Sequence, residues 1–440
     1  MTFFRKPALP FFVAALLLTV STAWAEGDEV KILPDIDYGG ELLVRSTLTG
    51  DWGGARTDLS RKGIQFDNSL THVAGSVVDG GVTGPVLSRF FSGRDDEETH
   101  LSWDNVLQFD TGKLGLWPGG VLKIRGEGRT GKGVNASAGA ISPVDSDMLF
   151  PLSNFGDTIY DLTEATFLQF LSEYMGVVVG LLNTLDGDAL DLAGSTRGTA
   201  QFSNLSFQLN PVELAAVPYK TLGGGVILLP TGDPHALTIS ALVFNTEDSS
   251  GGDPFSRDAG TSYSTEVNHR FRLFDRPGKQ VAGFVYADAD FGNLEDPRII
   301  LPGPAGSAKN STWAAYYGFE HYFKVDAETE HGTKGIGVFG RIGFSDGNPN
   351  PVEGGFSIGI GGNSPLRSQD TFGLGAYYVD VSDAAILDAL NVEDEQGLEL
   401  WYNIELAPWL HVTPDLQIID QGLPGTDTAY VVGIRTHLDL

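Results

Sequence analysis

The sequence predicts an all-β fold, a transmembrane antiparallel up-and-down β-barrel of about 16 strands with a short N-terminal helix before the first strand. Three observations support this prediction. Polar and apolar residues alternate along many segments of about ten residues, and long connections alternate with short ones between these segments. No stretch after residue 25 reaches the roughly 20 consecutive apolar residues that a membrane-spanning helix needs.

The first 25 residues are expected to be a secretory signal peptide. Arg5 and Lys6 form its basic start, and an apolar stretch leads to the cleavage pattern Ala23-Trp24-Ala25. An uncleaved membrane anchor is the alternative, but the apolar stretch is short and no stop-transfer charges follow it. We therefore expect export, a periplasmic segment with a short helix over residues 26–63, and a barrel channel over residues 64–440.

Charge and cysteine content exclude several classes of protein. The chain has 28 Lys and Arg against 57 Asp and Glu, a formal net charge of −29, which becomes −31 without Arg5 and Lys6. Such acidity argues against a nucleic-acid partner, since nucleic-acid binding needs clustered basic residues. The absence of cysteine excludes a disulfide scaffold and thiolate chemistry. No metal or cofactor is expected.

The candidate strands and their connections follow one another in a regular order. Sixteen segments are expected as strands, near residues 64–74, 99–110, 120–130, 158–170, 175–183, 222–230, 235–246, 261–274, 279–290, 311–323, 335–346, 354–362, 370–380, 396–406, 410–420 and 428–440. Connections such as 131–157 and 184–221 are long and polar, whereas those such as 171–174 and 407–409 are short. Long external loops and short periplasmic turns produce this order in an outer-membrane barrel, and a soluble periplasmic sandwich is the alternative.

Two connections depart from this order. The connection over 324–334 is long for a periplasmic turn, and that over 347–353 is short for an external loop.

The segment "GGVLKIRGEGRTGKG" (119–133) has ionisable residues at every second position, separated by Leu, Ile and Gly. Successive side chains of a strand point to opposite faces, so one face of this strand is charged. A charge that faces lipid at mid-membrane costs about 2–4 kcal/mol, so the charged faces should line a wet lumen. The candidate pore-lining residues are Lys123, Arg125, Glu127, Arg129, Glu266, Asn268, Arg270, Arg272, Arg341, Glu399, Trp401, Asn403, Glu405 and Arg435. An ordinary role in shaping the barrel by ion pairing is the alternative for each of them.

Three segments are similar to one known family. "LTGDWGGARTDLSRKGIQFD" (48–67) resembles the segment that precedes the barrel in the carbohydrate-selective porins of the OprB type. "NTLDGDALDLAGSTRGTAQFSNLSFQLNP" (183–211) and "WYNIELAPWLHVTPDLQII" (401–419) resemble later segments of the same family. Independently, Asp51 is a plausible N-cap and Gly63 a stop signal for a short helix in the first segment. The resemblance implies a sixteen-stranded channel of the bacterial outer membrane that is selective for sugars.

The expected function is therefore a porin that lets mono- or small oligosaccharides diffuse passively through a polar, Arg/Glu-lined lumen. Such a pore must bind its solute weakly enough to release it. A general or anion-preferring porin for small polar solutes is the alternative. An enzyme is not expected, because the eight histidines are scattered and no HExxH motif occurs.

The connection 184–221 is the candidate for a loop that folds into the pore. Its polar candidates for the constriction are Asp186, Asp188, Arg197, Gln201 and Asn204, mixed with large apolar residues. An external loop packed on its neighbours is the alternative. Besides a sugar substrate, the expected partners are outer-membrane lipid, lipopolysaccharide and the barrel-assembly machinery, while the oligomeric state stays open.

Overall fold

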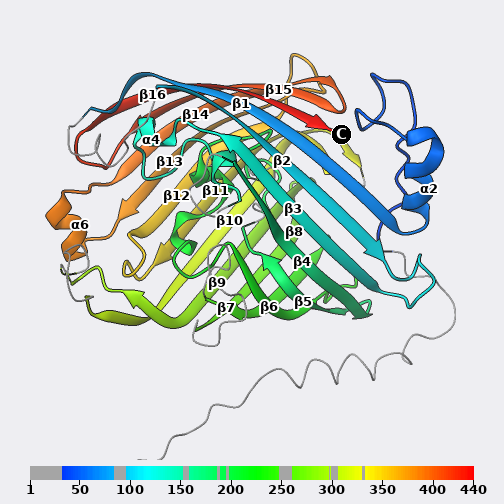
Figure 1. Ribbon diagram of the computed structural model, residues 1–440, viewed down its shortest axis with the longest axis horizontal. Coiled ribbons are helices and arrows are strands. Elements are labelled where there is room, and N and C mark those ends of the chain that lie inside the picture. The colour runs from blue at the N-terminus through cyan, green and yellow to red at the C-terminus, as the bar shows by residue number, and fades with distance from the viewer. Residues whose placement is uncertain are drawn as a thin grey trace, which may run out of the picture.

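Sixteen antiparallel strands close into one barrel, in which each strand pairs with its neighbours in the sequence and β1 pairs with β16 (Figure 1). The computed structural model describes residues 32–83, 96–151, 158–185, 189–194, 198–246, 260–296, 298, 306–329 and 332–440. The predicted signal peptide lies outside these residues. The predicted fold class and number of strands are confirmed.

Most strand boundaries lie within about three residues of the predicted ones, but β1 continues to Val82 instead of residue 74, and β10 continues to Thr329 instead of residue 323. The strands are β1 (Ile64–Val82), β2 (Glu97–Asp110), β3 (Gly120–Gly131), β4 (Thr158–Ser172), β5 (Met175–Asn183), β6 (Lys220–Leu228), β7 (Leu237–Asn245), β8 (Thr261–Leu273), β9 (Arg276–Gly292), β10 (Ala308–Thr329), β11 (Gly332–Ser345), β12 (Val352–Asn363), β13 (Thr371–Val381), β14 (Glu395–Ala407), β15 (Leu410–Asp420) and β16 (Thr426–Asp439). The helices of the described residues are short: η2 (Trp52–Gly54), α2 (Ala55–Arg61), α4 (Asn135–Ala138), η3 (Asp147–Leu149), α5 (Leu205–Gln208), η4 (Pro211–Glu213) and α6 (Ala385–Leu390). No helix in this part of the chain is both long and apolar enough to cross a membrane.

One of the two irregular connections disappears in the structure. β10 continues to Thr329 and β11 begins at Gly332, so only residues 330–331 separate the two strands. The sequence did not predict this extension of β10, because the last residues of the strand are mostly polar and lack the alternation of its apolar part. The other irregular connection, between Ser345 and Val352, is as short as the sequence indicates.

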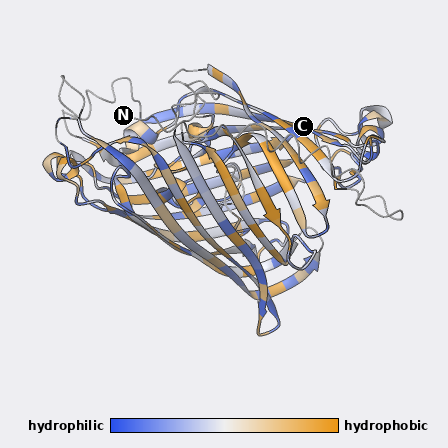
Figure 2. Cartoon of the chain, turned by 90° about the horizontal axis from the view of Figure 1, so that it is seen from below, coloured by the Kyte–Doolittle hydropathy of each residue, from blue (hydrophilic) through white to orange (hydrophobic). Residues whose placement is uncertain are grey.

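Hydrophilic and hydrophobic residues alternate along the strands (Figure 2), and successive side chains of a strand point to opposite faces of the wall. Val179, Val226 and Val243 on neighbouring strands β5, β6 and β7 point outward and are 36–37 % exposed. The next residues along these strands point inward. This apolar outer surface is typical of a barrel wall in contact with lipid.

The segment before β1 packs against the end of the barrel where the short connections lie (Figure 1). Backbone N–H groups of Ile32 and Leu33 donate to the Asp110 carboxylate, and the Leu48 N–H donates to the Asp439 carbonyl at 2.8 Å. Gly54, not Asp51, is the N-cap of α2. The Thr57 N–H still donates to Asp51, and the hydrogen bonds from Thr57 lower the pKa of that carboxyl, so this contact is present above the usual pKa and is lost as the pH falls. Gly63 ends the helical segment with φ = +86°, a conformation that suits glycine.

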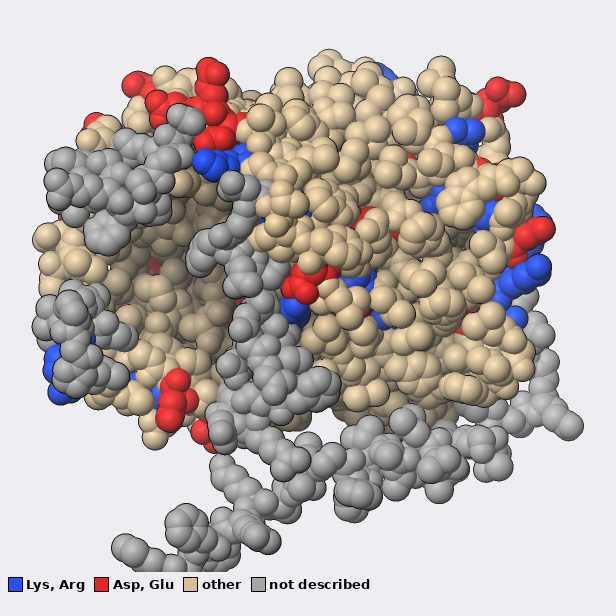
Figure 3. All heavy atoms as spheres, viewed as in Figure 1, with Lys and Arg blue, Asp and Glu red and all other residues tan. Residues whose placement is uncertain are grey.

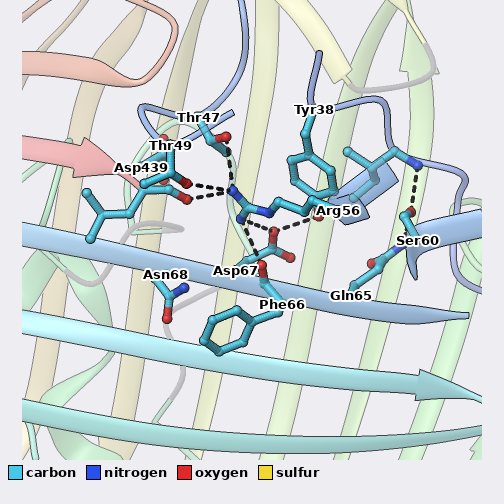
Figure 4. A network of polar contacts seen from close by, with 12 residues as sticks. Tyr38, Thr47, Thr49, Arg56, Ser60, Gln65, Phe66, Asp67, Asn68 and Asp439 are labelled. Atoms are coloured by element: carbon cyan, nitrogen blue, oxygen red, sulfur yellow. Dashed lines mark hydrogen bonds and ion pairs between the residues drawn. The ribbon is translucent and has the colours of Figure 1, made fainter. Parts of the chain in front are cut away.

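Arg56 of α2 connects this segment to β1 and to the residue that follows β16, the two strands whose pairing closes the barrel (Figure 4). Its side chain is fully buried and donates to the carbonyls of Leu440 (2.8 Å) and Phe66 (2.7 Å). The guanidinium also lies over the ring of Tyr38, 4.0 Å from its centroid, and 3.3 Å from Asp67. Since Phe66 belongs to β1 and Leu440 follows β16, Arg56 holds together the two strands that close the barrel.

We expect Arg56→Ala to destabilise the closed barrel by about 3 kcal/mol, because it removes a fully buried side chain and leaves the partly buried carbonyls of Phe66 and Leu440 without their charged donor. The measurement is unfolding by guanidinium in detergent, followed by heat-modifiable electrophoretic mobility. Arg61→Ala on the same helix is the matched control. Its ion pair with Asp58 is exposed at both ends, so it should change stability by less than about 0.5 kcal/mol. Equal stability of the two variants would contradict this role of Arg56.

Candidate functional site

Two long connections enter the barrel and fill part of its interior. We name them the first inserted segment (residues 132–151) and the second inserted segment (residues 189–219, of which 195–197 are not described). Both carry short helical turns, and Phe202, Phe207 and Asn204 of the second segment are completely buried. The barrel is hollowed at the end where the long connections lie (Figure 3).

Inward-facing glutamates of the wall bind the backbone of these segments. Glu399 on β14 accepts the N–H groups of Ser203 and Asn204, the latter at 2.9 Å. Four residues earlier on the same strand, Glu395 accepts the N–H groups of Ile141 and Ser142. Buried N–H groups must find acceptors, and a carboxylate can take two at once. β14 thus holds one inserted segment with each of two carboxylates.

Side chains of other strands also form hydrogen bonds with the second inserted segment. Glu320 on β10 accepts the Leu192 N–H at 3.0 Å, and Glu127 on β3 accepts the Tyr219 hydroxyl at 2.6 Å. Arg341 on β11 donates to the Phe207 carbonyl, and Arg435 on β16 donates to the Gly198 carbonyl. The second inserted segment is therefore bound from strands on several sides of the barrel.

Aromatic packing completes this attachment. Phe202 stacks on Phe207 with 4.2 Å between ring centroids, and Trp401 of β14 meets Phe202 edge-on at 5.7 Å. The Phe339 ring of β11 also contacts Phe202 edge-on, at 5.4 Å. Such pairs add to the free energy gained from the buried area itself. The interior next to β11–β14 is consequently a packed core.

The opposite part of the interior is open. A cavity of about 510 Å³ lies against the inner face of β3–β8, with Glu213 and Val217 of the second inserted segment on its other side. Ile32 and Leu33 reach it from the segment before β1. We name this cavity the open passage. Gly223 and Gly225 face inward on β6, where the absence of side chains widens it.

Ion pairs lie on the inner wall beside the open passage. Lys123 on β3 pairs with Glu164 on β4 at 2.8 Å, and Arg125 donates to Asp104 on β2 at 2.8–2.9 Å. On the other side, the Tyr316 hydroxyl of β10 donates to Glu266 of β8 at 2.6 Å. Each of these charged groups therefore has a partner within the wall.

The predicted pore-lining residues divide into several groups. Lys123 and Glu266 line the open passage, and Arg125 and Glu127 lie on the inner face of β3, paired as described above. Arg129, on the same face, lies next to Met148 of the first inserted segment. Arg341, Glu399, Trp401, Asn403 and Arg435 also lie on the inner face, but each is at most 7 % exposed beneath the inserted segments. These five do not line the open passage, because the two inserted segments cover them.

The remaining candidates lie nearer the strand ends with the short connections. Arg272 pairs with Glu328 at 2.8 Å, and Arg270 is opposite Lys279 on β9. Asn268 lies between Glu266 and Arg270 on the same face of β8, and Glu405 is opposite His411 near the end of β14.

The predicted constriction residues are only partly described. Asp186, Asp188 and Arg197 lie outside the described residues. Gln201 donates to the Asp191 carbonyl at 2.6 Å within the segment. Asn204 does not face the open passage: it is fully buried, where its side chain accepts the Ser206 N–H and caps α5.

The sequence did not predict the ion-pair partners of the pore-lining candidates, such as Glu164. It also did not predict that the first inserted segment enters the barrel. Glu164 was hidden by an irregularity, because the register between β3 and β4 shifts next to Arg125 and interrupts the alternation on β4. Glu395 could have been found, since it lies four residues before Glu399 and hence on the same face of β14. The first inserted segment is fixed by Asp145 and Asp147 on either side of His100. Burial raises the pKa of the Asp145 carboxyl.

Within the described residues, no three His, Asp or Glu side chains converge so as to hold a metal ion.

We expect Glu399→Ala to loosen the second inserted segment, since two buried N–H groups lose their acceptor at about 1–3 kcal/mol each. Single-channel recording should show a noisier open current and a conductance at least about twofold higher. Glu405→Ala is the matched control, because Glu405 shares the inner face of β14 but lies away from Ser203 and Asn204. The role of Glu399 would be refuted by a Glu399→Ala conductance equal to that of the control.

Comparison with known proteins places the chain in one family. The sequence pattern described as "Carbohydrate-selective porin, OprB family" matches residues 99–440. Porin B of Pseudomonas aeruginosa is 23 % identical, over 88 % of this chain and 90 % of that protein. Porin AaxA of Chlamydia pneumoniae is 32 % identical over a shorter region, 23 % of this chain and 25 % of that protein.

The fold agrees with this assignment. The high-pH structure of Pseudomonas putida OprB superposes with a TM-score of 0.75 at 20 % identity, covering 90 % of this chain and 99 % of that one. Its low-pH structure gives a TM-score of 0.55 at 15 % identity, with the same coverage. The closed barrel and its inner segments indicate a channel of the outer membrane. The chain belongs to the OprB family of carbohydrate-selective porins.

Proposed function

We propose that mono- and small oligosaccharides diffuse passively through the open passage, between the wall of β3–β8 and the second inserted segment. The observation that carries this proposal is the lining of the passage. Its polar groups are mostly amides and hydroxyls, among them Gln108, Thr166, Asn183, Ser240 and Ser264. Such groups can exchange hydrogen bonds with sugar hydroxyls one after another as a solute moves.

The pairing of charges favours an uncharged solute over an anion. Lys123 and Lys220, both on the inner wall, are each within ion-pair distance of a carboxylate, Glu164 and Asp161 respectively. A paired charge gives a much weaker field at a distance than an isolated one. The inner wall therefore offers hydrogen bonds to a solute with little net attraction for small anions.

The partners outside the lumen follow from the barrel surface. The apolar outer residues support contact with outer-membrane lipid, and the loops at the hollowed end would face lipopolysaccharide. The complete closure between β1 and β16 supports folding by the barrel-assembly machinery of the outer membrane.

Conductance measurements in planar bilayers test the proposed function. Added glucose or a disaccharide should reduce the single-channel current in a concentration-dependent manner, because a bound sugar occupies the narrow part of the passage. Solute flux into liposomes should show the same preference. An unaltered current with every sugar, together with a conductance ordered by ion charge, would refute the proposal and support a general or anion-preferring porin.

A second measurement tests the charge pairing. We expect Lys123→Gln to shift the reversal potential toward cation selectivity, because Glu164 then lacks the Lys123 charge at 2.8 Å. Half-blocking sugar concentrations should stay within about threefold of the wild-type values, since the net loss is one weak contact. Lys62→Gln, which removes the same charge after α2 and outside the barrel wall, should leave both quantities unchanged. A reversal potential unmoved by Lys123→Gln would contradict the assigned position of this pair.

A further inference from the structure

The inner wall beside the open passage carries an apolar stripe that the rule of a polar lumen does not predict. The stripe consists of Val121 on β3, Leu168 on β4, Val178 on β5 and Leu242 on β7, with Ile227 of β6 beside it. We name these five residues the aliphatic lane. All five line the open passage, and all except Val121 are partly exposed there.

Strand register shows that the lane is continuous. Val121 is paired with Leu168, Leu168 with Val178, Val178 with Gly225, and Gly225 with Leu242. Directly paired residues of antiparallel strands lie on the same face, about 4.5–5.5 Å apart. Gly225 adds no side chain, and Ile227, two residues further on the same face, lies next to this gap.

The lane also runs obliquely across the wall. Val121 is the second residue of β3, at the end with the short connections, whereas Leu242 pairs with Ser264, which lies near the opposite end of β8. Because the strands of a barrel are tilted, a row of paired residues climbs along the barrel axis. The lane therefore leads from the periplasmic side toward the external side.

Polar groups lie next to the lane at both of its ends. Lys123 and Glu164 lie beside its start, one inward position from Val121 on β3, and Glu266 with Tyr316 lies beyond its other end. A solute that fits this surface needs a continuous C–H face for the lane and hydroxyls along its edges. Hexoses provide both, and replacing or capping a hydroxyl extends the apolar face.

From this arrangement we infer that the aliphatic lane is a specificity-determining surface for sugars with an enlarged apolar face, namely deoxyhexoses and short alkyl glycosides. The inference rests on the proposed function and names the substrate class that the same passage prefers. Each CH₂ group removed from water gains enough free energy for roughly a fourfold effect on binding when burial is complete. Partial contact with one wall should give about twofold for each added group.

The experiment measures block of single-channel current by glucose, 6-deoxyglucose, methyl β-glucoside and butyl β-glucoside. In the wild-type channel, the half-blocking concentration should fall along this series, by about fivefold or more from glucose to the butyl compound. Val178→Thr combined with Leu242→Asn keeps the side-chain shapes but makes two of the five lane positions polar, so the fall in half-blocking concentration along the series should shrink to less than about twofold. Val178→Thr alone, a smaller change, should reduce the gradient about twofold.

The matched control is Val379→Thr, an equivalent change on the inner face of β13 within the packed core, where no solute passes. It should keep the wild-type gradient. A wild-type series without a gradient, or a gradient that survives in the double variant, overturns the role of the lane while glucose block still supports a sugar channel. Absence of block by every sugar, glucose included, overturns the proposed function and this inference with it.

Discussion

The interior of this barrel depends on the pairing of inward-facing carboxylates with backbone N–H groups of the inserted segments. A segment that leaves water to enter a lumen carries polar backbone groups that must be satisfied. Glu395 and Glu399 each satisfy two of them, and Glu320 satisfies another. Without these acceptors the aromatic residues around Phe202 would have no fixed position, because the backbone that carries them would favour solvent.

This pairing divides the lumen into two unlike parts. Beside β11–β14 the inserted segments and the wall form a packed core that contains the rings of Phe202, Phe207, Phe339 and Trp401. Beside β3–β8 a cavity separates part of the wall from the second inserted segment, and inward glycines on β6 widen the space. The same closed sheet thus serves as a scaffold for packing on one side and as the wall of a passage on the other.

A buried cation, Arg56, reinforces the closure of the sheet that the pairing of β1 with β16 provides. The Arg56 guanidinium donates to a carbonyl of β1 and to the carbonyl of the residue that follows β16, and the Tyr38 ring lies against it. The segment before β1 therefore does more than lead into the barrel, because Arg56 contacts both strands of the seam between the first and the last strand. Its terminal part, at Ile32 and Leu33, reaches the open passage as well.

The sequence by itself determined the barrel, its strand number, its membrane-facing surface and the inward direction of residues such as Lys123, Glu266 and Arg435. These properties follow from a period of two along each strand and from the length of each connection, both of which are local. Only the tertiary structure decided which inward residues meet solute and which are buried, since that depends on where residues 132–151 and 189–219 lie. Glu399 and Lys123 are both charged residues at alternating positions of a strand, yet Glu399 binds the second inserted segment and Lys123 lines the open passage. The aliphatic lane likewise became visible only when the register aligned Val121, Leu168, Val178 and Leu242 from four separate strands.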